Sequence, residues 1–217
     1  MSTALDNLIR QRTGGAVNVR GVRVQILYTL HCALRAHASG AEWTVTPEGL
    51  EDVDVTVNGV AEHVQVKTSK NRWAPHHMKD ALRSISEAAQ ASVGDPTRTF
   101  AVVVAGDAND GVCAIAARQD LPDSERAAPD ATLAKLLRKV GADAALAAHL
   151  ARTLEVVIID SDALEDDLNR DVVEAFDAHP SSAPVVVQAL AAFVLDRARS
   201  RTPFRAADLT QAYVSVA

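Results

Sequence analysis

The chain has 217 residues, of which 48% are hydrophobic and 4% aromatic, and its formal net charge at pH 7 is −6. The hydrophobic share excludes a disordered chain, and no apolar run approaches the roughly 18 residues that a membrane span needs. Cys32 and Cys113 are isolated, which excludes a disulfide framework and a cysteine-based zinc site. Because the N-terminal stretch also lacks the apolar segment of a signal peptide, we expect a cytoplasmic protein.

The acidic residues are concentrated in the second half of the chain. Residues 1–100 contain 11 Lys and Arg against 10 Asp and Glu, whereas residues 101–217 contain 11 against 18. Within the first half, residues 41–65 contain six acids and no base, and basic residues flank this stretch on both sides. An acidic strip between basic flanks suits a metal site beside a phosphate-binding surface, and ordinary surface charge gives the same arrangement about as often.

Helix and strand patterns alternate in the first half of the chain. Apolar residues at helical spacing predict a helix over 19–38, which Ser39-Gly40 ends. The other elements expected in this half are a short helix over 2–10, a strand within 42–49, a hairpin over 51–68, a helix over 74–94 and a doubly buried strand over 99–106.

The second half of the chain is predicted to be mainly helical. Residues 107–130 are expected to be mostly loop, with a short strand or helix at 111–117. After them we expect helices over 130–141 and 143–154, a buried strand over 155–160, helices over 162–178 and 183–199, and a last helix after Pro203. This order predicts an α/β fold with a mixed central sheet flanked by helices, in a domain over 1–180, and a helical C-terminal region over 181–217.

Asn58-Gly59 marks the turn of the predicted hairpin. This dipeptide favours a type I′ turn, which requires positive φ at both central residues. A two-residue loop pairs Val57 with Val60, and this pairing fixes which residues lie opposite one another along the two strands.

Polar residues share one face of this hairpin. In the predicted register Asp52 lies opposite Gln65, and Lys67 is diagonal to Asp52. Asp54 lies opposite His63 on the same face. The face is either the solvated side of an ordinary hairpin or a functional site, and the valines on the other face belong to the core.

The residue types on this face suit phosphodiester chemistry. A carboxylate and an amide oxygen are hard ligands for Mg²⁺ or Mn²⁺. Such a metal lowers the pKa of a bound water and braces a phosphate, and a neighbouring lysine offsets charge in the transition state. The hairpin therefore indicates a metal-dependent phosphodiesterase site as one interpretation.

Four short motifs occur in order within about residues 14–105. They are Gly14-Gly15 with Arg20-Gly21 and Gln25, then "EGLEDVDV", then "VQVKTSK", then Trp73. With these motifs the chain resembles the PD-(D/E)XK nuclease superfamily, in which an Asp on one strand is followed by a (D/E/Q)-x-K triplet on the next. It resembles more closely the double-stranded-DNA nuclease effector domains of bacterial anti-phage systems, including those in cyclic-oligonucleotide (CBASS) signalling.

The resemblance implies a restriction-endonuclease-like core and magnesium-dependent cutting of double-stranded DNA. It also implies activation by a sensor domain or a separate regulatory protein, and self-association into a homo-oligomer. The implied catalytic residues are Asp52, Gln65, Lys67 and Gln25. The implied metal ligands are Asp52 and Gln65, with Asp54 as a second or the principal carboxylate and Glu48 reaching from the preceding turn. Arg20, Arg23, Lys70 and Arg72 would contact the DNA backbone without reading sequence.

Two other interpretations remain open at this point. In the first, a nuclease-like fold without catalysis binds DNA or protein. In the second, the chain is a helical interaction protein, and the hairpin is only its scaffold.

Overall fold

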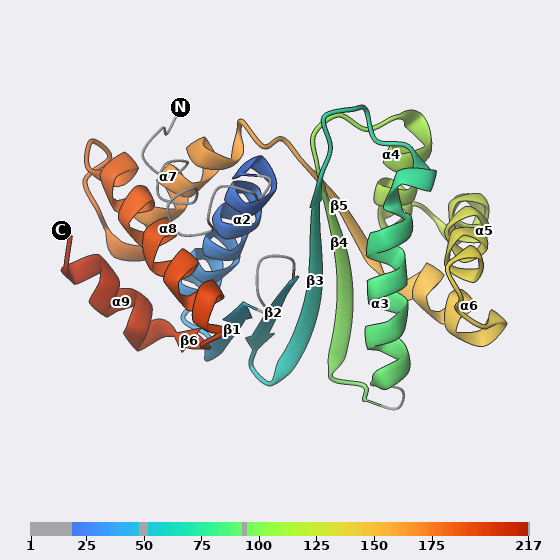
Figure 1. The fold of residues 1–217 in the computed structure, drawn as a ribbon, viewed down its shortest axis with the longest axis horizontal. Coiled ribbons are helices and arrows are strands. Elements are labelled where there is room, and N and C mark those ends of the chain that lie inside the picture. The colour runs from blue at the N-terminus through green and yellow to red at the C-terminus, as the bar shows by residue number, and fades with distance from the viewer. Residues whose placement is uncertain (1–18, 48–51, 93–94, 217) are drawn as a thin grey trace. The chain divides into compact units, whose positions relative to one another are not determined.

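Six strands form one mixed sheet in the computed structural model of the chain, which describes residues 19–47, 52–92 and 95–216 (Figure 1). They are β1 (Trp43–Pro47), β2 (Asp52–Val57), β3 (Val60–Thr68), β4 (Arg98–Ala105), β5 (Glu155–Ile159) and β6 (Phe204–Arg205). Their order is β5-β4-β3-β2-β1-β6. β1 is antiparallel to β2 and β6, whereas β4 and β5 are parallel. The predicted α/β class, a mixed sheet flanked by helices with a helical C-terminal region, is confirmed.

The chain divides into two compact units. Unit 1 comprises Met1–Ala61 and Ser161–Ala217, and unit 2 comprises Glu62–Asp160. In the described part of unit 1 the helices are α2 (Val19–Ala38), α7 (Leu164–Phe176), α8 (Ala183–Ser200) and α9 (Ala206–Val214). In unit 2 they are η1 (Pro75–Met78), α3 (Lys79–Ala91), α4 (Asp110–Ala117), η2 (Arg118–Asp120), α5 (Asp123–Lys139) and α6 (Ala144–Thr153). Both helices beyond residue 181 fall in unit 1, and the predicted division at residue 180 stays a prediction.

The hairpin turn forms as predicted. Asn58 has a φ of 50° and Gly59 a φ of 81°, the left-handed conformation that a type I′ turn requires at both positions. β2 ends at Val57 and β3 begins at Val60, so the loop has two residues. The predicted helix over 2–10 lies outside the described residues.

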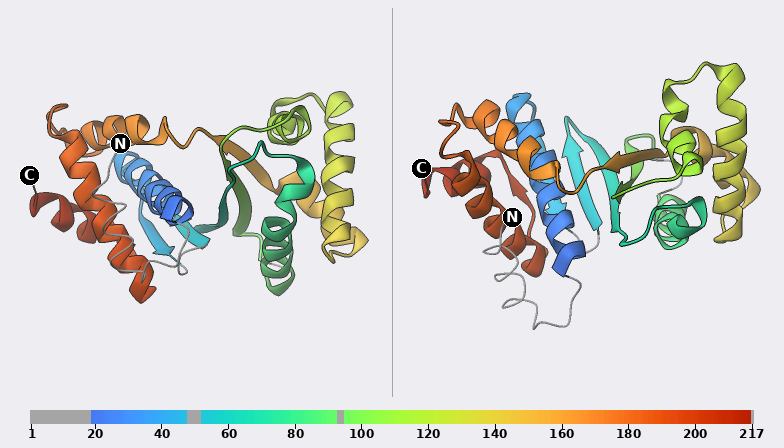
Figure 2. Two further views of the ribbon diagram at one scale, coloured as in Figure 1. Left: turned by 45° about the horizontal axis from the view of Figure 1, so that its top comes forward. Right: turned by 90° about the horizontal axis from the view of Figure 1, so that it is seen from above.

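α2 is the central helix of unit 1 and has the predicted bounds. Its core side chains Leu30, Ala33 and Leu34 are completely buried, and both α7 and α8 pack beside it (Figure 2). Trp43 of β1 packs edge-on against Phe204 of β6, with their ring centroids 6.0 Å apart. This contact anchors β6, which the sequence did not predict because a two-residue strand has no alternation to detect.

α2 and α7 run in the same direction. Polar contacts connect α2 with α7 and the residues just before it, and the residue numbers of the partners increase together along both segments. The pairs are Arg20–Ser161, Arg23–Glu165 and His31–Asp171. The N-termini of two helices therefore lie at the same end of unit 1.

Unit 2 has an apolar core on one face of β4 and β5, where α3 packs on β4 and α4 on β5, and α5 and α6 lie outside these helices (Figure 1). Phe100, Val102 and Val104 of β4 belong to this core, and the intervening residues of the strand are also buried. β4 is thus buried on both faces, as predicted. β5 lies at the edge of the sheet and only Val156 is fully buried, so the prediction of a second doubly buried strand is wrong.

Residues 107–130 are largely helical, which corrects the predicted loop. Asn109 caps α4 by accepting a hydrogen bond from the backbone N–H of Val112. α5 begins at Asp123 and contains Pro129, although the prediction started a helix only after this proline. Proline inside a helix removes one backbone hydrogen bond, and here the packing of Leu133 and Leu137 in the core outweighs that local preference.

Arg118 has a completely buried side chain in unit 2. Its guanidinium donates to the carbonyls of Ile115 (2.6 Å), Ala151 (3.1 Å) and Leu154, and its Nε lies 3.3 Å from Asp130 Oδ1. These carbonyls belong to the ends of α4 and α6, where backbone oxygens lack helical partners. Burial lowers the pKa of Arg118, and the neighbouring Asp130 carboxylate opposes that shift. Arg118 therefore connects two helix ends within the core.

We expect Arg118→Met to lower the free energy of unfolding by about 3–5 kcal/mol, because it removes the ion-pair partner of the partly buried Asp130 and the Arg118 hydrogen bonds to the carbonyls of Ile115 and Ala151. Urea denaturation measures this change. The matched control is Arg152→Met at an exposed position of α6, which should change the free energy by less than about 0.5 kcal/mol. A loss below about 1 kcal/mol for Arg118→Met would contradict the structural role.

Glu62 on β3 gives unit 2 a dependence on pH. Burial raises the pKa of Glu62, and the charge of Glu155 raises it further. The folded chain therefore holds this proton more tightly than the unfolded chain, and stability falls as pH rises above the ordinary pKa of glutamate. We expect Glu62→Gln to raise the Tm at about pH 7 and to have little effect near pH 4, where the carboxyl is largely protonated in the folded state. Glu87→Gln, at an exposed position of α3, should show no such difference between the two pH values.

Candidate functional site

The polar face of β3 is directed into the core of unit 2. His63 is 5% exposed and Gln65 is 1% exposed. The ring of His63 lies 6.3 Å from that of Phe100, a member of the core cluster, and alternate residues of a strand share a face. Gln65 thus faces the core. The alternation of the sequence predicted an open face, but it cannot reveal that helices further along the chain cover it.

The amide of Gln65 is an unsatisfied polar group. Neither its nitrogen nor its oxygen has a hydrogen-bond partner among the described residues. A buried polar group without a partner costs on the order of 1–3 kcal/mol, so Gln65 lowers the stability of unit 2 unless a bound species satisfies it.

The other predicted catalytic and metal-binding residues are divided between the two units. Lys67 is half-buried on β3 in unit 2, and Asp54 is half-buried on β2 in unit 1. Gln25 is partly exposed on α2 in unit 1. Asp52 begins β2 with a side chain outside the described part, and Glu48 lies outside the described residues altogether. Neither unit by itself brings the predicted set together.

A metal site was part of the prediction. No group of three or more His, Cys, Asp or Glu in the described ranges is arranged to hold a metal ion. Of the predicted ligands, only Asp54 and Gln65 have described side chains, and they belong to different units. The Mg²⁺ or Mn²⁺ prediction stays a prediction, and no chemical step is assigned to the ion.

Two of the predicted DNA-contacting residues lie in the loop after β3. Lys70 and Arg72 are both exposed there. Arg72 donates from Nε to the carbonyl of Ala108 at 3.2 Å, and its Nη2 lies 3.9 Å from Asp110. The loop therefore holds Arg72 beside the start of α4 while most of the guanidinium remains in solvent, and its role in binding stays a prediction.

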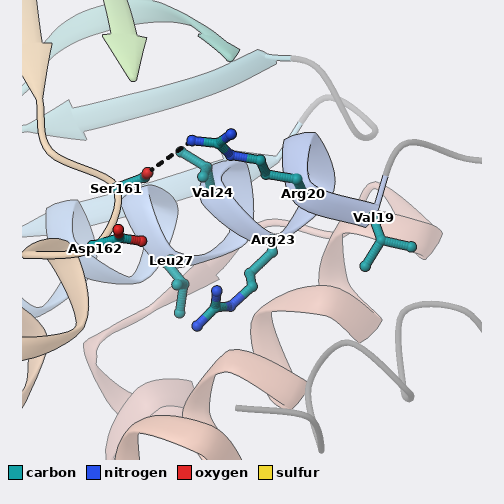
Figure 3. Close-up of a pocket in the computed structure, with 7 residues that line it drawn as sticks. All are labelled: Val19, Arg20, Arg23, Val24, Leu27, Ser161 and Asp162. Carbon is teal, nitrogen blue, oxygen red and sulfur yellow. Dashed lines mark hydrogen bonds between the residues drawn. The ribbon is translucent and has the colours of Figure 1, made fainter. Parts of the chain in front are cut away.

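The other two predicted residues, Arg20 and Arg23, line one pocket in unit 1 (Figure 3). The pocket has a volume of about 310 Å³ and lies between the first turns of α2 and the segment that precedes α7. Its lining residues are Val19, Arg20, Arg23, Val24, Leu27, Ser161 and Asp162. Arg20 Nη2 donates to Ser161 Oγ at 3.4 Å, which is the dashed contact in Figure 3. The pocket thus joins parts of the chain about 140 residues apart.

This pocket carries charges of both signs: arginines on the side of α2, and Asp162 with the acidic first turn of α7 (Glu165, Asp166 and Asp167) on the other. Two guanidinium groups line it, and α2 has no acid in its first turn. The N-termini of α2 and α7 lie at this end of unit 1, and each helix N-terminus carries about half a positive charge. Asp162 in the wall and Glu165, which forms an ion pair with Arg23, supply compensating negative charge.

Sequence reasoning missed Ser161, Asp162 and Glu165. They follow β5 in a short acidic stretch that looks like the solvated start of a helix, and no local pattern connects them with α2. Only the parallel packing of α2 and α7 places them beside Arg20 and Arg23.

Solved structures share the architecture of the chain. A Cap4 SAVED/CARF-domain containing receptor of Moraxella osloensis matches 92% of this chain and 48% of its own length, with a TM-score of 0.63 and 11% identity. Two structures of the Acinetobacter baumannii Cap4 SAVED/CARF-domain containing receptor each match 88% of this chain and 44% of their own length. The structure with the cyclic trinucleotide 3′3′3′-cAAA has a TM-score of 0.62 and 14% identity, and the structure with 2′3′3′-cAAA has a TM-score of 0.61 and 13% identity. The chain shares their fold. It spans less than half the length of these receptors, and no family model or curated protein matches its sequence.

These neighbours contradict the predicted function. They are named as receptors, two of them with a cyclic trinucleotide, and none is named as a nuclease. The prediction of a magnesium-dependent endodeoxyribonuclease is therefore wrong, and the interpretation as a binding module fits better. Membership of the PD-(D/E)XK superfamily and binding of double-stranded DNA are not shown by these neighbours, and the relation to anti-phage effectors stays a proposal.

No helix within the described ranges is long and apolar enough to cross a membrane. Self-association and a regulatory partner stay predictions.

We expect Gln65→Met to raise the free energy of unfolding by about 1–2 kcal/mol, because methionine keeps the length of the side chain and removes two unsatisfied polar atoms. Urea denaturation checks this. Gln90→Met, at an exposed position of α3, is the control and should be nearly neutral. Destabilisation by Gln65→Met would instead indicate that a bound water or ion satisfies the amide.

Proposed function

We propose that the chain is a ligand-binding module of an anti-phage effector, and that the pocket at the start of α2 binds the phosphate groups of a nucleotide. The observation that carries this proposal is that Arg20 and Arg23 both line one cavity at an end of unit 1 where two helices begin. The module recognises a ligand and performs no bond-breaking step.

Three side chains of the pocket, those of Arg20, Arg23 and Ser161, suit a phosphate. Guanidinium groups remain charged at any physiological pH and present paired N–H donors that match phosphate oxygens. Free backbone N–H groups at helix N-termini bind anions for the same reason. The hydroxyl of Ser161 lies within reach of Arg20 and can donate to a phosphate oxygen.

The size of the pocket limits the ligand that it can enclose. A volume of about 310 Å³ is at the lower end of the range for small-molecule sites, so the pocket suits one nucleotide unit of a larger molecule. Cyclic oligonucleotides consist of such units joined by phosphodiesters. The cyclic trinucleotides named with the Acinetobacter baumannii receptors support this class of ligand.

Binding in this pocket would connect two distant parts of the chain. One wall is α2 and the other is the segment Ser161–Asp162 that leads into α7. A phosphate that contacts both walls binds more tightly when the walls are close together than when they are apart. This difference in affinity shifts the equilibrium toward the close arrangement. Ligand binding would thus stabilise one arrangement of α2 and α7.

We expect Arg20→Ala to weaken binding of 3′3′3′-cAAA by about tenfold to a hundredfold, because charge-assisted hydrogen bonds contribute about 1.5–3 kcal/mol each. Fluorescence anisotropy with labelled ligand measures the Kd. Arg199→Ala removes the same charge from an exposed position of α8 outside the pocket, and it should change the Kd by less than about twofold.

The same assay contains the outcomes that would reject the proposal. If Arg20→Ala and wild type bind equally, the ligand lies elsewhere. If wild type binds none of 3′3′3′-cAAA, AMP and inorganic phosphate, the pocket is not a phosphate site. If duplex DNA competes as well as 3′3′3′-cAAA at equal phosphate concentration, the protein is a general polyanion binder instead of a nucleotide receptor.

A further inference from the structure

One of the two arginines that line the pocket already forms an ion pair within the protein. Arg23 in α2 pairs through Nη2 with Oε1 of Glu165 in the first turn of α7. Both side chains are mostly buried, at 19% and 29% exposure. The pair therefore forms with less competition from water than a surface ion pair has.

This pair conflicts with binding of an anion by Arg23. The carboxylate of Glu165 accepts from Nη2, which is one of the donors that a phosphate would need for a paired contact with the guanidinium. Glu165 also lies at the N-terminus of α7, where the helix dipole stabilises negative charge. A ligand must thus replace an internal anion that is already well placed.

We propose that Glu165 is a built-in competitor of the ligand, which occupies Arg23 when the pocket is empty and sets the concentration at which the pocket fills. This inference rests on the proposed function of the pocket as a phosphate site. The phosphate displaces the carboxylate from Arg23. The ligand therefore binds more weakly than it would to a pocket without the Arg23–Glu165 pair, by the free energy needed to break that pair.

The displaced carboxylate borders a small space that has polar groups in its wall. Glu165 lines a second cavity of about 50 Å³ with the polar Asn169 and Gln188 and the apolar Leu27, Pro184, Val187 and Ala191. Asn169 Oδ1 is buried there without a hydrogen-bond partner among the described residues. A cavity of this size and polarity can hold water, so the carboxylate can be hydrated after it leaves Arg23. Its release therefore costs less than it would in an apolar core.

The exchange would also change how α7 is held. Arg23–Glu165 fixes the first turn of α7 to α2, whereas His31 and Asp171 join the two helices further along, with Nδ1 and Oδ2 2.6 Å apart. Loss of the first contact removes one polar link from the first turn of α7, where Leu164 remains buried, and leaves the second contact in place. The ligand would therefore act on one end of the α2–α7 pair.

The test compares Glu165→Gln with Asp166→Asn by anisotropy with labelled 3′3′3′-cAAA. Glu165→Gln keeps the length of the side chain and removes the competing charge, and it should lower the Kd by about threefold to tenfold. Asp166→Asn removes the same charge one residue away at an exposed position, and it should lower the Kd by less than about twofold. Thermal melting confirms that both variants are folded.

A double variant isolates the role of Arg23. In an Arg23→Ala background, Glu165→Gln should give no more gain than Asp166→Asn, because the competition acts through that arginine. The proposal that Glu165 competes with the ligand is overturned if Glu165→Gln raises the affinity more than Asp166→Asn does in the Arg23→Ala background. It is also overturned if the two acidic substitutions have equal effects in wild type. Weaker binding by Glu165→Gln also overturns it, since Glu165 would then position Arg23 for the ligand. In each of these cases, weaker binding of 3′3′3′-cAAA by Arg20→Ala still supports the phosphate site. If Arg20→Ala binds as well as wild type, the phosphate site itself is rejected, which is a separate result.

Discussion

The parallel packing of α2 against α7 is the constraint on which unit 1 depends. Leu27 and Leu30 of α2 and Leu168 of α7 are buried within the unit, and the polar pairs align along the two helices. Parallel neighbours have their dipoles aligned, which is unfavourable, so the contact relies on apolar burial and on ion pairs between the helices. The same alignment brings two helix N-termini together, and the pocket lined by Arg20 and Arg23 is its direct result.

Burial decides which polar residues can act on a ligand. Gln65 has the right chemistry for a site, but it faces the core of unit 2 and meets no partner among the described residues. Arg20 lies in a less conspicuous sequence, yet it is exposed at the edge of a cavity. Polar character in an alternating strand indicates which residues share a face, and the covering elements determine whether that face is open.

The sequence predicted what local chemistry determines. The bounds of α2 follow from its apolar spacing and from Gly40, and the hairpin turn follows from Asn58-Gly59. The helix through Pro129 and the short strand β6 were missed because tertiary packing stabilises both against weak local signals. The pocket could not be predicted at all, since Ser161 and Glu165 meet α2 only after the chain has completed unit 2. The resemblance to nucleases placed the chemistry on the hairpin, and this site remains a prediction without a supporting arrangement inside either unit.

The parallel direction of α2 and α7 also has a consequence for the order of folding. Two parallel helices cannot be joined by a short loop, and here the connection contains all of unit 2, a continuous segment from Glu62 to Asp160. Unit 2 can thus collapse while the ribosome is still synthesising the chain, whereas α2 must wait for α7 to emerge more than a hundred residues later. Until then β1 and β2 are available to cover α2, but the apolar surface that packs on α7 and α8 has no native cover, so nascent chains arrested before residue 164 are the species that we expect chaperones to bind.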